Sequence, residues 1–137
     1  MKKLILAICV VILSATYSFA QQGQIPHHVM DAFKQAHPMA FQAMWSNDGA
    51  NYKVGYFDES KMQHFKVYND NEQLISHTYE VVAGNIPAPI HDYYKKLDAI
   101  EGSYKVWTVI DNSGKTSFSV EYNNAITNFD ESGKVIK

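Results

Sequence analysis

The chain contains no arginine and only one cysteine. That cysteine, Cys9, lies in an N-terminal apolar segment that we expect to be removed, so the rest of the chain can form no disulfide and offers no thiol nucleophile. Arginine supplies the forked, bidentate contacts that phosphate and nucleic-acid sites favour. Its absence, together with a net charge of −2 at pH 7, argues against nucleic-acid binding.

Long apolar runs are missing too, apart from one short run near the N-terminus. Residues 1–20 carry Lys2 and Lys3, then this run, then the small-residue boundary Ser18-Phe19-Ala20. This order is typical of a secretory signal peptide, and the run is shorter than the roughly 20 residues of a membrane-spanning helix. We therefore expect cleavage after Ala20, a periplasmic or secreted protein, and no membrane span in the mature chain. The alternative is an uncleaved N-terminal anchor.

Recognisable catalytic motifs are a further absence. The sequence has no serine in a strand-turn-helix elbow, no paired-glutamate frame and no glycine-rich phosphate loop. Its serines fall in predicted strands or turns without the context of a nucleophile. We therefore predict that the protein is not an enzyme.

What the sequence does contain is an internal repetition. The pairs Ile25-Pro26 and Ile86-Pro87 are 61 positions apart, and the segments 68–75 and 129–136 resemble each other at the same offset. A fixed period of this length predicts a repeated structural unit. We expect one domain, 21–137, built of two repeats at about 25–82 and 86–137.

Each repeat begins with apolar residues at helical spacing. In the first, Ile25, Val29 and Phe33 share one face, Pro26 suits the first turn, and Pro38 ends the helix. The second repeat has the same features. Its helix starts with Pro87 and Pro89, its apolar stripe consists of Ile90, Tyr93 or Tyr94, and Leu97, and Gly102 closes it.

After each helix the pattern becomes alternating, with β-branched and aromatic residues that favour strands. The predicted strands are 41–46, 52–57, 63–68 and 74–82 in the first repeat, and 104–110, 116–122, 125–129 and 134–136 in the second. The connections are short and rich in Asn, Asp and Gly, which makes neighbouring strands antiparallel. The sequence thus predicts an α+β fold of two tandem repeats, each a helix followed by an antiparallel β-meander, with the helices on one face of the sheet.

Several of these features together resemble a known family. They are the double Ile-Pro pattern, the helix ending at His37-Pro38, a strand containing Trp45, the strand Tyr52-Lys53-Val54, and the repeated closing turn. This combination resembles the PepSY-like secreted bacterial proteins, whose fold is similar to that of the β-lactamase-inhibitor protein. The resemblance covers Ile25 to Ile136 and implies that fold, but it transfers no functional residue. The chain departs from the pattern at Glu72, where glycine is usual.

Six histidines raise the question of a metal site. They are His27, His28, His37, His64, His77 and His91. Zinc ligands usually converge from helical i, i+3 or i+4 spacing or from paired cysteines, and neither arrangement occurs. We therefore expect no zinc site.

Acidic turns offer oxygen ligands for calcium instead. Asp70 and Glu72 lie in one turn and Asp130 lies in its counterpart. The regular spacing and internal glycine of a helix-loop-helix calcium site are absent, and Asp and Asn are common in hairpin turns for backbone reasons. We therefore expect no cofactor, with calcium as the one possible exception.

Aromatic residues make up 13% of the chain and often occupy both faces of one strand. If the helices cover one face of the sheet, aromatic side chains on the other face form a surface typical of partner binding. The residues that we assign to this open face are Phe57, His64, Tyr68, Tyr79 and Trp107. Coverage of both faces, with the outward rings serving as cross-strand pairs, is the alternative.

The sequence therefore predicts an exported, non-catalytic binding module that engages a protein or peptide through its open sheet face. The alternative is a calcium or small-ligand sensor or buffer of the cell envelope.

Overall fold

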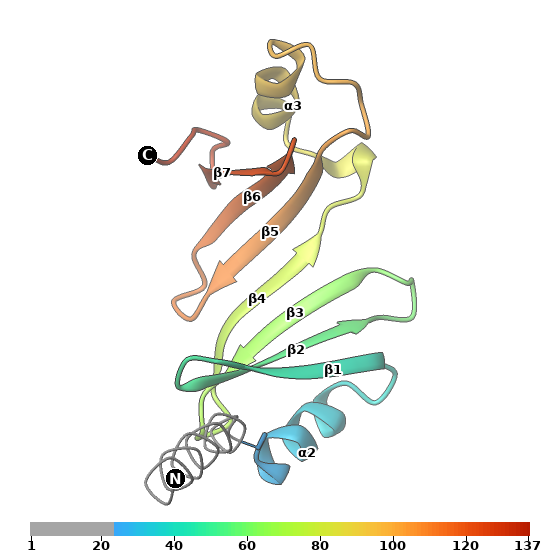
Figure 1. Ribbon diagram of the computed structural model, residues 1–137, viewed down its shortest axis with the longest axis vertical. Helices are drawn as coiled ribbons and strands as arrows, with labels where there is room; N and C mark the ends of the chain where they lie inside the picture. The colour runs from blue at the N-terminus through green and yellow to red at the C-terminus, as the bar shows by residue number, and fades with distance from the viewer. Residues whose placement is uncertain (1–23) are drawn as a thin grey trace, which may run out of the picture.

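The computed structural model describes residues 24–137 (Figure 1). The predicted signal peptide and its cleavage site lie outside these residues. One antiparallel sheet of seven strands runs through the molecule, and its strands are neighbours in the same order as in the chain (Figure 1). The strands are β1 Phe41–Asp48, β2 Asn51–Phe57, β3 Gln63–Tyr68, β4 Leu74–Glu80, β5 Lys105–Asp111, β6 Thr116–Tyr122 and β7 Ala125–Asp130.

Two α-helices pack on this sheet, one at each end of the molecule (Figure 1). The first, α2, spans His27–Ala36, and the second, α3, spans Ala88–Lys95; the short 3-10 helix η1, Ala83–Asn85, lies between β4 and α3. As predicted, Pro26 and Pro87 directly precede the two helices. No helix among residues 24–137 has the length and apolar character needed to cross a membrane.

The sequence placed the end of α3 too far along the chain. The helix ends at Lys95 rather than near Gly102, and the side chain of Leu97 is 52% exposed, so Leu97 is not part of the packed stripe. A turn follows the helix directly, with Asp98 at a φ of 53°. The backbone therefore leaves the helical conformation before Leu97 can face the sheet.

The strand pattern was predicted well, with one exception. The segment 134–136 was expected to be a strand, but it forms a single isolated bridge between Phe129 and Val135. The bridge belongs to a tight turn in which the N–H of Gly133 donates to the carbonyl of Asp130. The β3–β4 turn has the equivalent hydrogen bond, from the N–H of Glu72 to the carbonyl of Asn69. The division of the chain into two tandem repeats stays a prediction.

Strand pairing shows that both helices lie on the same face of the sheet. One row of paired residues crosses five strands: Val54, Lys66, His77, Ile110 and Thr116. The neighbouring rows on this face include Tyr56 near α2 and Val106 near α3, and each is buried in the core beneath its helix. Because paired residues in adjacent strands point to the same side, the helices share this face and leave the other uncovered.

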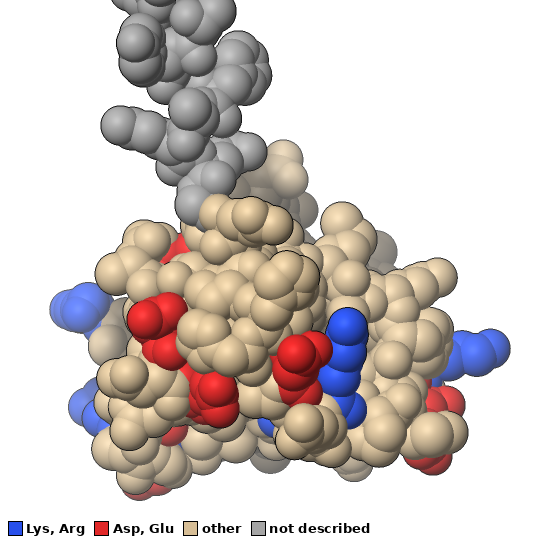
Figure 2. Space-filling view, turned by 90° about the horizontal axis from the view of Figure 1, so that it is seen from below, with Lys and Arg blue, Asp and Glu red and all other residues tan. Residues whose placement is uncertain are grey.

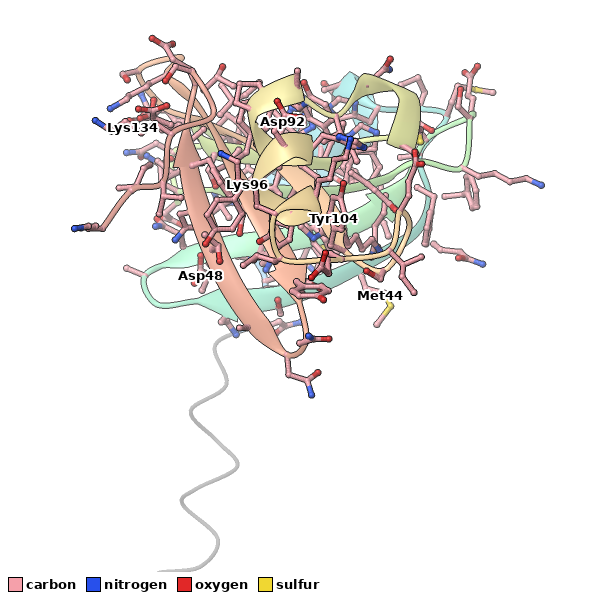
Figure 3. All side chains as sticks on the ribbon, turned by 90° about the horizontal axis from the view of Figure 1, so that it is seen from above. Met44, Asp48, Asp92, Lys96, Tyr104 and Lys134 are labelled. Atoms are coloured by element: carbon pink, nitrogen blue, oxygen red, sulfur yellow. The ribbon has the colours of Figure 1, made fainter. Side chains whose placement is uncertain are left out.

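Two hydrophobic cores lie beneath the two helices. The core under α2 contains Val29, Phe33, Val54, Tyr56 and Tyr68. The core under α3 contains Ile90, Tyr94, Tyr104, Val106, Val120 and Phe129. In Figure 3, Asp92 lies on α3 and Lys96 directly follows its last residue, and the ring of Tyr104 stacks on Tyr94 of the helix at 4.6 Å. The central strands β3 and β4 connect these cores and form the floor between the two helices.

Candidate functional site

The uncovered face of the sheet carries an aromatic pair near its centre. The rings of Phe65 on β3 and Trp107 on β5 have their centroids 5.6 Å apart, although the two strands are separated by β4. The β4 residues between them on this face, Thr78 and Glu80, pair with Phe65 and Trp107 respectively. The short Thr78 side chain leaves room for the two large rings to meet.

Lysines cover both rings of this pair. The Nζ atom of Lys53 lies 4.8 Å from the centroid of Phe65, and the Nζ atom of Lys105 lies 4.6 Å from the ring of Trp107. Both distances are within the range of a cation–π interaction. We call the four residues Lys53, Phe65, Lys105 and Trp107 the central stack.

Acidic side chains fix one end of the central stack. The indole N–H of Trp107 donates to Oε1 of Glu121 at 3.2 Å, and the Nζ atom of Lys105 lies 3.6 Å from Oε2 of Glu80. As a result Trp107 is only 7% exposed. The Trp107 indole lies beneath charged groups, and a partner on this face would contact Lys105 and Glu121 before the indole.

A hollow lies at the other end of the central stack. Its volume is about 360 Å³, and its lining includes Met44, Gly55, Phe57 and Phe65. Gly55 is required here, because a Cβ atom at this position would lie 2.9 Å from the Phe65 ring. Met44 is 76% exposed and projects from the side of the sheet away from α3 (Figure 3). The open face thus offers an apolar hollow beside a charged stack.

Three of the five residues predicted for the open face lie on the other side. Tyr68 is 7% exposed in the core under α2. His64 pairs with Tyr56 of the same core and with Tyr79, so all three rings are on the helix-covered face. Only Phe57 and Trp107 were placed on the correct face. Whether any of the five binds a partner is untested.

The error has a simple physical origin. Alternation shows which residues of one strand share a face, but not which face the helix covers. On β3, both sets contain aromatic residues, with His64 and Tyr68 on one face and Phe65 on the other. The missed residues Lys53, Phe65 and Lys105 follow from the common register of the strands once Val54, Val106 and Val120 are known to be buried, and that burial is a property of the tertiary structure.

The acidic turns use their carboxylates to build the backbone turn. Oδ1 of Asp130 accepts hydrogen bonds from the N–H groups of Ser132 and Lys134 and from the hydroxyl of Ser132, at 2.6 to 3.0 Å. These bonds lower the pKa of Asp130. Asp70 instead lies near His28, with Oδ1 3.8 Å from Nε2. Glu72 occupies the left-handed conformation, with a φ of 63°.

No group of three or more His, Asp or Glu side chains within residues 24–137 is arranged to hold a metal ion. Calcium binding by Asp70, Glu72 or Asp130 therefore stays a prediction. It is checked by thermal unfolding with and without millimolar calcium, because a ligand of the native state raises the melting temperature.

The surface charge shown in Figure 2 is mixed. On the end of the molecule that carries α2, acidic side chains and lysines lie among uncharged residues, one acidic side chain beside a lysine, and the lysines do not merge into a continuous basic patch (Figure 2). This arrangement gives no support to nucleic-acid binding on that end.

Comparisons with known proteins show the fold and little more. No protein-family model and no curated protein matches the chain. Solved structures do match. A candidate periplasmic protein from Bacteroides eggerthii aligns at a TM-score of 0.67 and 18% identity, over 84% of this chain and 88% of that chain.

Two further structures have the same architecture. A DUF2874 family protein from Bacteroides uniformis aligns at a TM-score of 0.64 and 15% identity, over 83% of this chain and 88% of its own. A BLIP-like protein from Bacteroides fragilis aligns at a TM-score of 0.57 and 18% identity, over 84% of this chain and 86% of its own. At these identities the likeness shows the fold alone: the chain has an α+β, BLIP-like fold, and the PepSY-like resemblance stays a prediction.

Proposed function

We propose that the protein is a periplasmic or secreted, non-catalytic binding module that engages a protein or peptide through the open face of its sheet. The observation that carries this proposal is the central stack, two aromatic rings under two lysines on a face that neither α2 nor α3 covers. Export is supported by the signal-peptide pattern at residues 1–20 and by the description of the similar protein from B. eggerthii as periplasmic.

The chemistry of the face indicates how a partner is held. Exposed apolar atoms of Met44 and the partly exposed ring of Phe57 border the hollow, so they can bury an apolar side chain of the partner. The lysines Lys53 and Lys105 and the glutamates Glu80 and Glu121 give the face both signs of charge. Such groups select the orientation of a partner more than they add affinity.

Substitutions at exposed positions test this proposal without disturbing the core. Met44→Glu places a charge in the hollow, and Lys105→Glu reverses the charge over Trp107. Leu97→Glu is the matched control, because Leu97 is also exposed, at 52%, and follows the helix on the covered face. We expect a specific partner, captured from envelope extract and then purified, to bind the double variant at least about tenfold more weakly than the control.

Unchanged circular dichroism and melting temperatures of both variants show that folding is intact. Equal affinity of the double variant and the Leu97→Glu control for the purified partner contradicts binding through the open face. Substitution of Tyr68 is unsuitable for this test, because that side chain supports the core under α2.

A further inference from the structure

The covered face holds a buried lysine that has no acidic partner. Lys66 on β3 is 9% exposed, and its Nζ atom lies 2.7 Å from Nε2 of His37. The ion pairs among residues 24–137 join His28 to Asp70, His64 to Asp58 and Lys105 to Glu80, and none of them includes Lys66. A buried ammonium group with only a neutral hydrogen-bond acceptor is costly, because burial removes its hydration without supplying an opposite charge.

Lys66 borders a cavity of about 500 Å³ between the end of α2 and strands β2 to β4. This volume is typical of small-molecule sites. Histidines surround the lysine there: His37 after α2, His64 on β3 and His77 on β4. The segment Pro38, Met39 and Ala40 also lines the cavity. The lining therefore combines basic groups with apolar ones.

The acidic residues of the cavity do not neutralise Lys66. Oδ2 of Asp58 accepts a hydrogen bond from Nε2 of His64 at 3.0 Å, and Oδ1 accepts one from the N–H of Met62 at 2.9 Å. Glu59 is exposed in the turn beside it. Both carboxylate oxygens of Asp58 thus accept hydrogen bonds, one from its own turn and one from His64.

Hydrogen bonds join the histidines of the cavity to Asp58, to Lys66 and to one another. Nε2 of His64 donates to Oδ2 of Asp58, and Nδ1 of His64 lies 3.0 Å from Nε2 of His77. Nε2 of His37 accepts from the Lys66 ammonium and therefore carries no proton of its own. None of these contacts brings a negative charge to Lys66.

The pKa values of the cluster agree with the absence of a negative charge in contact with Lys66. Burial, then the charge of Lys66 and then that of His64, lower the pKa of His37. The same three causes, followed by the charge of His37, lower the pKa of His77 to about 4. Burial also lowers the pKa of Lys66 itself. An anion beside these groups would have the opposite effect on each of them.

We propose that this cavity binds a small organic carboxylate, whose oxygens contact the Lys66 ammonium and the adjacent histidine rings while its apolar part lies against Pro38, Met39 and Ala40. The site is on the helix-covered face and is independent of partner binding by the central stack. The test of this carboxylate site is therefore independent of the test of the function proposed above.

The test uses hexanoate as the probe and hexanamide as its uncharged match. We expect hexanoate to raise the melting temperature of the wild-type protein with increasing concentration, and hexanamide to leave it unchanged. Lys66→Met keeps most of the side-chain volume but removes the charge, and should weaken hexanoate binding about tenfold to a hundredfold in calorimetry. Lys34→Met is the matched control on the exposed side of α2, and it should bind like the wild type.

A second readout on the wild type keeps the proposal testable if Lys66→Met fails to fold. Hexanoate should shift the NMR signals of the His37 and His77 rings and raise the pKa of His77 toward its ordinary value. Unmoved ring signals at saturating hexanoate overturn the proposal. So does stabilisation by inorganic phosphate or Zn²⁺ but not by hexanoate, since either result assigns a different ligand to the cluster.

Discussion

The two halves of the molecule, residues 24–80 and 86–137, solve the same packing problem with different side chains. Each places one short helix on part of a common sheet. The helices even use equivalent positions: Val29 and Ile90 are both fully buried, and Phe33 and Tyr94 are 2% and 1% exposed one turn later. The plan of the fold therefore requires only that these helix positions be large and apolar.

The halves differ in the polarity of the side chains beside their cores. Under α3 the buried cluster consists of apolar and aromatic side chains, and Tyr104 and Val106 of this cluster also line a cavity of about 780 Å³. Under α2, Tyr56 of the buried cluster lines a cavity together with Lys66 and His77. Buried polar groups contribute less to stability than apolar ones of similar size. We therefore expect the core under α3 to contribute more to stability than the core under α2.

Truncation of the core under α3 should give the largest effect. Ile90→Ala removes a fully buried side chain from the core under α3 and should lower the free energy of unfolding by about 2 to 5 kcal/mol. Val29→Ala, at the equivalent position under α2, should cost less, because one fewer methylene is lost and each contributes about 0.8 kcal/mol. Urea unfolding measures both.

Leu97→Ala is the control for this pair, since the exposed side chain should contribute less than about 0.5 kcal/mol. A larger loss from Val29→Ala than from Ile90→Ala would reverse the comparison between the halves.

Lowering the pH should destabilise the protein through the N-terminal half. The folded pKa of His77 is about 4, whereas its ordinary value is 6.5. Between these values the unfolded chain binds a proton that the folded chain does not, so stability is fully present above about pH 6.5 and falls as the pH drops toward 4. We expect a loss of about 1 to 2 kcal/mol, reduced from the full shift because solvent reaches the half-buried ring.

His77→Gln should flatten this part of the curve of unfolding free energy against pH. The same substitution at His91 on α3 is the matched control and should leave the slope as in the wild type. An identical slope in wild type and His77→Gln would show that this histidine does not cause the acid sensitivity.

Small effects of opposite sign are expected at the equivalent turn positions Glu72 and Gly133. Both have a positive φ, 63° and 80° respectively. Glycine adopts this conformation without strain, so Glu72→Gly should stabilise the first turn by about 0.5 to 1 kcal/mol. Gly133→Ala should destabilise by about 1 to 2 kcal/mol, because the conformation is strained and the new Cβ would lie 2.7 Å from Cβ of Pro89.

Thermal unfolding of the two turn variants checks their opposite signs. Destabilisation by Glu72→Gly would mean that Glu72 makes a contribution beyond its backbone conformation. An unchanged melting temperature for Gly133→Ala would show that the turn moves away from Pro89 at little cost.

Local patterns explain why so much of the fold could be predicted. β3 and β6 were predicted with their observed bounds, and the other five named strands within two residues at each end. Hairpin connections rich in Asn, Asp and Gly specified antiparallel neighbours. The single seven-stranded sheet was not predicted, because the pairing of β4 with β5 spans the whole of α3 and depends on contacts that no local pattern records.

The candidate sites show the same limit. The histidines at 37, 64 and 77 were noticed in the sequence, but as separate surface residues, and Lys66 was not singled out. Their closeness arises because the sheet register aligns Lys66 with His77, and the end of α2 then places His37 above them. Such a cluster has no spacing rule, since its members come from three different elements.

The sequence by itself determined the local elements of this protein: helices from apolar residues at helical spacing, strands from alternation, and turns from residues that tolerate positive φ. Only the tertiary structure decided which face of the sheet is open, so that Phe65 and Trp107 lie on it while Tyr68 and Tyr79 do not. The reason is physical. A strand has two faces of equal geometry, and only packing against a helix distinguishes the one that becomes the core.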